Sequence, residues 1–185
     1  MNIVQPIRDK NKLEEMKEEL RKSGTRNYLL FLLGINTGLR VSDIVKLQVK
    51  DVKDPTGTMK EYVTIIEKKT KKLKRFPICN VLLTELTRYT SNMEQEQYLF
   101  PSQKGTKNIT EVQAYRILNK AGKNIGLTEI GTHTMRKTFG YHHYQQNHDV
   151  AILQEIFNHS APSITLRYIG INQDNIDMAY RNFSL

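Results

Sequence analysis

The sequence predicts a mainly α-helical α+β domain with a small three-stranded antiparallel β-sheet. Most apolar residues recur at the spacing of one helix face, as Leu13, Met16 and Leu20 do. Short runs rich in valine and isoleucine, typical of strands, are concentrated between residues 49 and 78, and the turn sequence Asp54-Pro55-Thr56-Gly57 separates two of them. A length of 185 residues, 38% of them hydrophobic, fits one domain of this kind.

The composition indicates a negatively charged partner. The formal net charge is +9, and nucleic acid is the first candidate, although charge alone does not separate a nucleic-acid-binding protein from a soluble basic one. One cysteine, Cys79, excludes an internal disulfide and fits a reducing compartment. The amino terminus lacks the apolar core of a signal peptide, and no apolar run is long enough to span a membrane. We therefore expect a cytoplasmic protein without a membrane partner.

Hydrophobic periodicity divides the chain into three parts. Residues 1–8 are expected to form a flexible arm, residues 9–172 the folded domain, and residues 173–185 a C-terminal segment whose helix runs from about Gln173 to Phe183. The apolar stripe of that helix comprises Ile176, Ala179, Tyr180 and Phe183. A short helix is marginal alone, so this stripe needs a surface to cover it.

The second predicted helix leads to the first candidate site residue. The stretch from Leu29 to Ile35 is apolar nearly all round, which indicates a buried helix. Gly38 is expected to end this helix with a positive φ, and Arg40 then projects from the turn. Asp43 follows three residues later. An acidic residue in a first helical turn is favoured by the helix dipole, whatever other role it has.

Three strands are predicted, at Val49–Val52, Tyr62–Ile66 and Leu73–Ile78. The tip between the second and third strands is strongly basic. Its basic residues are Lys68, Lys69, Lys71, Lys72, Lys74 and Arg75. The usual interpretation of such a run is a solvated, charged hairpin.

Further basic residues lie before and along a helix that begins at Thr110. The sequence Thr110-Glu111-Val112-Gln113 has the form of a capping box. The side chains expected to face inward are Val112, Tyr115, Leu118 and Ala121. The basic residues of this region are Lys104, Lys107, Arg116, Lys120 and Lys123. Each is either a contact to nucleic acid or part of a solvated surface.

The stretch from Thr132 to Tyr168 contains side chains suited to attack on a phosphodiester. His133 and Arg136 are three residues apart and share one face of a helix that Thr132 is expected to cap. His159 follows in Asn-His-Ser, and Tyr168 comes nine residues later. Arginine clamps phosphate oxygens, histidine transfers protons near neutral pH, and tyrosine can act as a covalent nucleophile.

Together these elements resemble the tyrosine recombinases, also called phage-type integrases. TGLRVSDIVKL, HTMR, NHS and a following tyrosine occur in that family's order and at similar spacing, from about Lys10 to Tyr168. The resemblance implies the family's catalytic-domain fold. It also implies an enzyme that cleaves and rejoins DNA at specific sites through a 3′-phosphotyrosine intermediate. The catalytic residues it implies are Arg40, Lys69, His133, Arg136, His159 and Tyr168.

Lys69 is assigned as the catalytic lysine by its spacing from Pro77. Family members carry a hairpin lysine that reaches the cleavage site, and Lys69, eight residues before Pro77, matches its position best. Lys71 and Lys72 remain competitors.

Other roles implied by the resemblance are supporting ones. Asp43 would orient Arg40, and the helix after Thr110 would lie along the DNA. Lys137 joins the predicted DNA contacts, although many relatives have a histidine there. Phe157-Asn158 precedes His159 where leucine-glycine is usual, so Asn158 is expected to alter how His159 is presented.

The implied partner is double-stranded DNA, bound by a homo-tetramer that assembles from free monomers. In the family, the segment after the tyrosine docks onto a neighbouring protomer, and complete members usually carry an N-terminal clamp domain. The present chain resembles the catalytic domain alone, either natural or cut from something longer.

No metal or cofactor is predicted. All five histidines lie between residues 133 and 159, but His142 and His143 would diverge on a helix and no carboxylate is well spaced to join them. Two alternatives stay open. One is a DNA-binding regulator that has lost catalysis, and the other is a topoisomerase or telomere-resolvase-like enzyme with the same chemistry.

Overall fold

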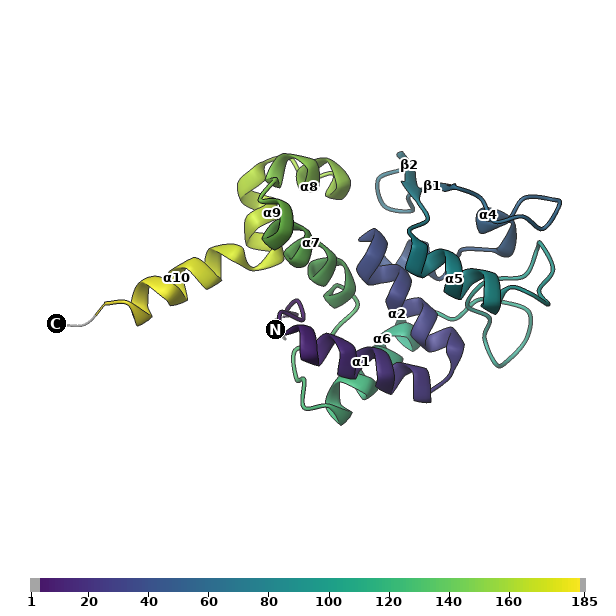
Figure 1. Ribbon diagram of the computed structural model, residues 1–185, viewed down its shortest axis with the longest axis horizontal. Coiled ribbons are helices and arrows are strands. Elements are labelled where there is room, and N and C mark those ends of the chain that lie inside the picture. Colours follow the sequence, from purple (N-terminus) through teal and green to yellow (C-terminus); the bar gives the residue numbers. More distant parts are fainter. Residues whose placement is uncertain (1–3, 184–185) are drawn as a thin grey trace.

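The computed structural model describes residues 4–183, in which helices surround a central helix and a β-hairpin lies at one side (Figure 1). The helices are α1 (Lys10–Lys22), α2 (Thr25–Thr37), α3 (Val41–Ile44), α4 (Val49–Val52), α5 (Asn80–Tyr89), α6 (Glu111–Asn124), α7 (Thr134–Asn147), α8 (Val150–Phe157), α9 (Pro162–Ile169) and α10 (Ile171–Arg181). The strands are β1 (Tyr62–Ile66) and β2 (Leu73–Pro77). This arrangement confirms the predicted fold class, mainly helical with a small antiparallel sheet. Within the same range, no helix has both the length and the apolar character needed to cross a membrane.

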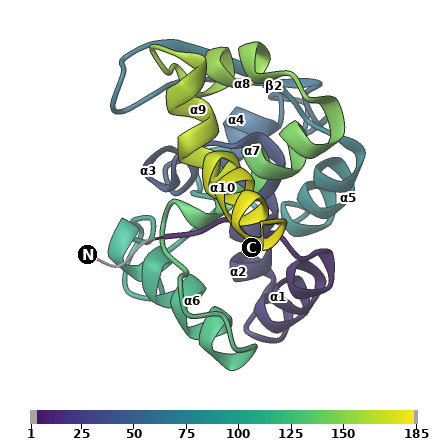
Figure 2. The same cartoon turned by 90° about the vertical axis from the view of Figure 1, so that its left-hand side faces the viewer.

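Helix α2 forms the centre of the main hydrophobic core. Every residue from Tyr28 to Gly34 is buried, as its apolar sequence predicts. The helix packs against α1, α5 and α7, and α1 in turn packs against α6 (Figure 2). Gly38 ends α2 with a φ of +61° and donates its N–H to the carbonyl of Gly34 at 3.1 Å. The chain therefore turns sharply just before Arg40.

A second, smaller core lies among α7, α8 and α9. Its buried residues are Leu153, Phe157, Ile169 and Ile171. Gly140 allows the close approach of these helices, because a Cβ at this position would lie 2.7 Å from both Cζ of Phe157 and Cγ2 of Ile169. Met135, five residues earlier on α7, belongs to the main core. Helix α7 therefore joins the two cores.

The β-hairpin has two strands, not the predicted three. Tyr62 pairs with Pro77 and Ile66 with Leu73 in an antiparallel register. The strand predicted at Val49–Val52 is wrong, since these residues form the short helix α4. The side chain of Asp51 accepts the backbone N–H of Gln48 at 2.8 Å, and this N-terminal cap outweighs the strand preference of two valines.

Residues 4–8 form an extended N-terminal segment that is packed on the domain. Ile7 is 3% exposed and its N–H donates to Oγ1 of Thr138 on α7 at 2.9 Å. Its carbonyl lies 2.9 Å from Nε2 of His142, also on α7. The predicted flexible arm is corrected accordingly for residues 4–8, because an apolar side chain and both backbone groups of Ile7 find partners. Residues 1–3 lie outside the described residues.

Helix α6 begins with the predicted capping box, in which Thr110 and Gln113 exchange hydrogen bonds. The inward face was partly mispredicted. Leu118 and Ala121 are buried, but Val112 is 57% and Tyr115 39% exposed. Ala114 and Gly122 complete the buried face instead, so the helix is rotated relative to the predicted stripe.

Helix α10 extends away from the rest of the chain (Figure 1). Only its start is docked in the described structure, where Ile171 is buried and Asp174 pairs with Arg8 at 3.0 Å. Among the predicted stripe residues, Ile176, Tyr180 and Phe183 are exposed. The side chain of Ala179 and residues 184–185 lie outside the described part.

Candidate active site

The beginning of α7 supplies two of the predicted catalytic side chains. The helix starts at Thr134, so His133, rather than the predicted Thr132, occupies the N-cap position. The imidazole makes no capping hydrogen bond to the helix. Arg136 follows one turn later. The helix end thus presents both groups on one side, as their spacing predicts.

Arg136 is held rigidly by backbone carbonyls. Its side chain is buried, its Nη1 donates to the carbonyl of Gly38, and its Nη2 donates to that of Phe157 at 2.9 Å. The guanidinium also lies over the Phe157 ring, 4.3 Å from its centroid. Burial lowers the pKa of Arg136 to about 10, which leaves the group charged at neutral pH. A fixed cation therefore faces the site.

Arg40 is positioned by a carboxylate that the sequence did not single out. Its Nη1 lies 2.8 Å from Oε1 of Glu67, whose side chain is fully buried at the end of β1. The expected partner, Asp43, bonds elsewhere: its Oδ1 accepts the backbone N–H of Lys68 at 2.9 Å. The prediction that Asp43 orients Arg40 is therefore corrected, because the hairpin brings Glu67 to the guanidinium.

Tyr168 stands beside these groups on α9. Its hydroxyl lies 3.1 Å from Nδ1 of His133. Burial raises the pKa of Tyr168, and the nearby cations Arg136 and Arg40 offset part of that rise. The phenol is therefore protonated at neutral pH and needs a base to become a nucleophile. His133 suits this role because burial and the neighbouring Arg136 lower its pKa and keep the imidazole neutral.

His159 also packs beside the tyrosine. Its ring centroid is 5.2 Å from that of Tyr168 and 5.4 Å from that of Phe157. Its Nδ1 is 2.9 Å from Oγ1 of Thr165. When the threonine hydroxyl donates this bond, Nε2 carries the ring proton and can donate it to a phosphate oxygen. Burial, together with Arg136, lowers the pKa of His159 and favours this neutral form.

A surface pocket of about 390 Å³ brings four predicted catalytic residues together, and Arg40, Lys69, His133 and Arg136 all line it. Tyr168 adjoins the pocket through its contact with His133. The geometry thus places an acceptor for the phenol proton, two fixed cations and one exposed lysine around a space open to a ligand.

The hairpin lysines have different surroundings. Lys69 lines the pocket, whereas Lys71 lines a separate hollow with Asp43. Lys68 pairs with Glu111 at 3.0 Å. These positions favour Lys69 over Lys71 as the lysine that reaches a substrate.

Two other basic residues of β2 point in opposite directions. Lys74 is half-buried and donates its Nζ to the carbonyl of Ile156 at 2.8 Å. Burial, reinforced by the charge of Arg136, lowers the pKa of Lys74 to about 8. Arg75 is exposed and lies over the ring of Tyr62, 3.8 Å from its centroid. Lys74 is thus part of the site interior, not the exposed DNA contact that the sequence suggested.

The remaining predicted DNA-binding residues lie in the hairpin turn, the loop before α6, α6 and α7. The exposed ones are Lys72, Lys104, Lys107, Arg116, Lys120 and Lys123. Lys137 is instead engaged, with its Nζ donating to the carbonyl of Val4 at 2.8 Å and lying 5.3 Å from the centroid of the Tyr168 ring.

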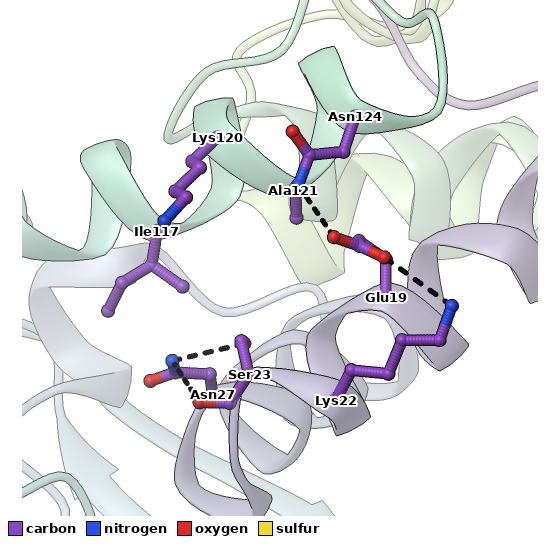
Figure 3. A pocket seen from close by; sticks show the side chains of 8 residues that line it. All are labelled: Glu19, Lys22, Ser23, Asn27, Ile117, Lys120, Ala121 and Asn124. Carbon is purple, nitrogen blue, oxygen red and sulfur yellow. Dashed lines mark hydrogen bonds and ion pairs between the residues drawn. The ribbon is translucent and has the colours of Figure 1, made fainter.

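Lys120 lines a second hollow of about 410 Å³, where α6 faces α1 and the start of α2 (Figure 3). Glu19 in this hollow already accepts a hydrogen bond from Asn124 at 2.6 Å and lies 3.7 Å from Lys22. None of the predicted catalytic side chains lines it. Four of the six predicted catalytic side chains line the pocket of Arg40 and Arg136 instead.

Comparison with known proteins identifies the family. The phage integrase family profile matches residues 8–175. The chain belongs to the phage integrase family. It is 50% identical over 183 residues to the probable integrase/recombinase YoeC of Bacillus subtilis strain 168, covering 99% of this chain and 98% of YoeC. This confirms the family resemblance and the enzyme class that goes with it, the tyrosine recombinases, which cleave and rejoin DNA.

More distant relatives extend beyond the matched region. Tyrosine recombinase XerA of Pyrococcus furiosus is 29% identical over 178 residues, covering 93% of this chain but 60% of XerA. A crystal structure of XerA recombinase gives a TM-score of 0.75 at 19% identity, covering 98% of this chain and 67% of that one. The Tn1549 transposon integrase in complex with transposon right end DNA gives 0.72 at 17% identity, covering 91% of this chain and 61% of that one. These structures share the fold.

Sequence reasoning missed Glu67 and the contact of Asn158 with the hairpin, and it gave Lys74 the role of an exposed DNA contact. A glutamate or lysine in a hairpin has the same local pattern whether it is solvated or buried. Only the unusual residue pair Phe157-Asn158 gave a signal, and it did not reveal a partner. The residues described contain no group of three or more histidine, cysteine, aspartate or glutamate side chains able to hold a metal ion.

Proposed function

We propose that this phage integrase family member cleaves and rejoins DNA strands with Tyr168 as its nucleophile. The observation that carries the proposal is the 3.1 Å contact between the Tyr168 hydroxyl and Nδ1 of His133, next to the buried Arg136. A tyrosine, a base and a fixed cation in contact are the minimum set for attack on a phosphodiester.

The proposed step conserves the phosphodiester. The Tyr168 oxygen attacks the phosphorus, its proton passes to His133, and a 3′-phosphotyrosine bond forms while the bond to the 5′ oxygen breaks. Lys69 gives that leaving oxygen a proton. A 5′ hydroxyl then reverses the step, from the same duplex or from a partner duplex. Because the covalent link keeps the bond energy, rejoining needs no ATP.

The cations stabilise the transition state. Arg40 and Arg136 both line the pocket, and their guanidinium groups would bond the nonbridging oxygens as charge develops there. His159 would donate a hydrogen bond to phosphate through Nε2. Removal of one such donor typically costs about a hundredfold in rate or more.

Double-stranded DNA is the proposed partner. A net charge of +9 and the exposed lysines of the hairpin and α6 support contacts to the phosphate backbone. We infer that the chain is a monomer when free and a homo-tetramer on DNA, with helix α10, whose Ile176 and Tyr180 are exposed, exchanged between protomers. An enzyme that acts on DNA in this way is proposed to work in the cytoplasm.

A trapping experiment tests this function and requires no defined target site. The chain is incubated with a library of nicked duplexes of random core sequence, in which cleavage releases a short strand that diffuses away. Adducts that survive detergent are isolated, their DNA is sequenced, and the attached peptide is mapped. We expect the DNA to be joined to Tyr168.

Two variants complete the test. Tyr168→Phe should form no adduct, whereas Tyr144→Phe, which keeps its ring in the small core, should react like the wild type. Binding without any adduct would favour the inactive regulator, and relaxation of plasmids without exchange between two sites would favour the topoisomerase. An adduct mapped to another tyrosine would reject the assignment.

A further inference from the structure

Glu67 is a buried carboxylate at the point where β1 enters the hairpin turn. Its side chain is 0% exposed. Oε1 accepts from Nη1 of Arg40 at 2.8 Å, and Oε2 accepts from Oγ1 of Thr70 at 2.6 Å and from Nδ2 of Asn158 at 3.2 Å. Burying a carboxylate is costly unless donors surround it, and here both oxygens are satisfied.

The three donors to Glu67 come from three different segments of the chain. Arg40 follows α2, Thr70 lies in the hairpin turn, and Asn158 lies between α8 and α9. Each segment carries or adjoins a catalytic group, since Lys69 precedes Thr70 and His159 follows Asn158. One carboxylate therefore connects the supports of three catalytic side chains.

Asn158 is suited to this connection by its backbone as well as its amide. It ends α8 with a φ of +54°, a left-handed conformation that asparagine tolerates better than most residues. Its Nδ2 donates to Glu67, and its Oδ1 lies 3.4 Å from Nζ of Lys72 on the far side of the hairpin turn. A glycine would provide the same turn but neither contact.

Charge gives Glu67 a second effect. Arg40, Arg136 and Lys74 are close enough that the charges of both arginines lower the pKa of Lys74. The Glu67 carboxylate opposes this crowding, and its own pKa is lowered by Thr70 and Arg40 although burial acts against it. The bond to Glu67 uses one guanidinium nitrogen of Arg40, while Arg40 also lines the open pocket and its side chain is 15% exposed. The pair therefore fixes the cation and leaves Arg40 at the pocket wall.

We propose that Glu67 is a positioning residue for strand cleavage: it sets the Arg40 guanidinium through Oε1 and, through Thr70 and Asn158, fixes the hairpin of Lys69 against the turn of His159. This inference rests on the proposed cleavage function. It assigns Glu67 and Asn158 no contact with DNA.

The first test separates positioning from binding. Adduct formation is measured at increasing concentrations of one nicked duplex selected by the trapping experiment. Glu67→Gln keeps the shape of the side chain but removes its charge and places an NH₂ group against donors. We expect the rate of adduct formation at saturating DNA to fall by on the order of tenfold to a hundredfold. The DNA concentration that gives half of the maximal rate should change by less than about threefold. Glu96→Gln, which removes an exposed carboxylate paired with Lys50, is the control and should match the wild type.

The second test distinguishes the effect of Glu67 on the Lys69 hairpin from its effect on Arg40. A duplex with sulfur at the 5′-bridging position has a leaving group that needs no proton. Asn158→Gly loosens the Lys69 hairpin, so its slow cleavage should be largely restored on the sulfur duplex. Glu67→Gln also releases Arg40, so its rate should be restored only in part.

Several outcomes would overturn the inference. One is a Glu67→Gln cleavage rate within twofold of the wild-type rate. Another is a loss of cleavage rate that equals the unfolded fraction of the variant, measured by thermal unfolding under the same conditions. A third is a cleavage rate above that of the wild type. The last would show that Glu67 competes with phosphate for Arg40. If the wild type itself forms no adduct, the proposed function fails and this inference falls with it.

Discussion

Replacement of Gly140 by alanine should uncouple the nucleophile from its base. A Cβ at Gly140 would lie 2.7 Å from Cγ2 of Ile169 and 2.7 Å from Cζ of Phe157. Carbon atoms in contact prefer about 3.5–4.0 Å, so α9 must move away from α7 by roughly 1 Å. Tyr168 is on α9 and His133 at the start of α7, so this shift lengthens their 3.1 Å contact. Misplacement by about 1 Å can cost on the order of a hundredfold in rate.

Gly122→Ala is a matched control for this change. Gly122 lies within α6, and its Cβ would meet Cγ1 of Ile130 at 2.7 Å, with the three nearest atoms all belonging to Ile130. Overpacking typically costs about 1–3 kcal/mol, and replacing glycine in a helix returns about 1 kcal/mol, so both variants should lose similar stability.

The assay combines urea unfolding with the rate of adduct formation on one selected duplex. We expect comparable midpoints for the two variants and a rate loss of about a hundredfold only for Gly140→Ala. Equal rates would refute the argument that the α7–α9 approach at Gly140 sets the distance from nucleophile to base.

Four further outcomes are expected. The rate of adduct formation at limiting DNA concentration should fall as the pH is lowered, because His133 must be neutral to accept the phenol proton. Since the pKa of His133 is lowered, the midpoint of this fall should lie below about 6.5, the ordinary histidine value. A midpoint above that value would contradict the role of His133 as the base. Lys69→Ala should cleave normal DNA slowly and 5′-bridging-sulfur DNA at nearly the wild-type rate; without such rescue, Lys69 is only a phosphate contact. Arg116→Ala should reduce the slope of log affinity against log salt by about 0.9 if Arg116 contacts phosphate, and Lys120→Ala in the hollow of Figure 3 should change the slope less. Deletion of residues 174–185 should leave a folded DNA-binding domain with impaired strand exchange, and full recombination by this truncation would reject the coupling role of α10.

The sequence predicted the members of the site better than their supports. The resemblance to the tyrosine recombinases named Tyr168, His133 and Arg136, and the structure brings these side chains together. The partner of Arg40 could not be named. Whether Glu67 is buried depends on how the hairpin folds back on a turn about ninety residues later in the chain, and no local pattern encodes such a contact.

The structure confirms the two hairpin strands, predicted at Tyr62–Ile66 and Leu73–Ile78 and observed at Tyr62–Ile66 and Leu73–Pro77, but which side chains face inward differs from a simple alternation. Leu73 is 72% exposed, while its neighbour Lys74 points inward to the carbonyl of Ile156. Alternation of apolar and polar residues would place these two side chains the other way round. The carbonyl acceptor and the neighbouring Glu67 outweigh the cost of burying the lysine stem and its charge. Similarly, the strand expected at Val49–Val52 gave way to a helical turn because Asp51 caps it.

Because the chain has two hydrophobic cores, the residues of the proposed active site come from both sides of the boundary between them. Arg40 and Lys69 belong to the side of the large core, Tyr168 and His159 to the side of the small one, and Arg136 bonds a carbonyl on each side. A small cooperative unit opens at a lower free energy than the whole domain. Amide protons of α8 and α9 should therefore exchange with solvent before those of α2, and each such opening would separate the nucleophile from the cations while the rest of the domain stays folded.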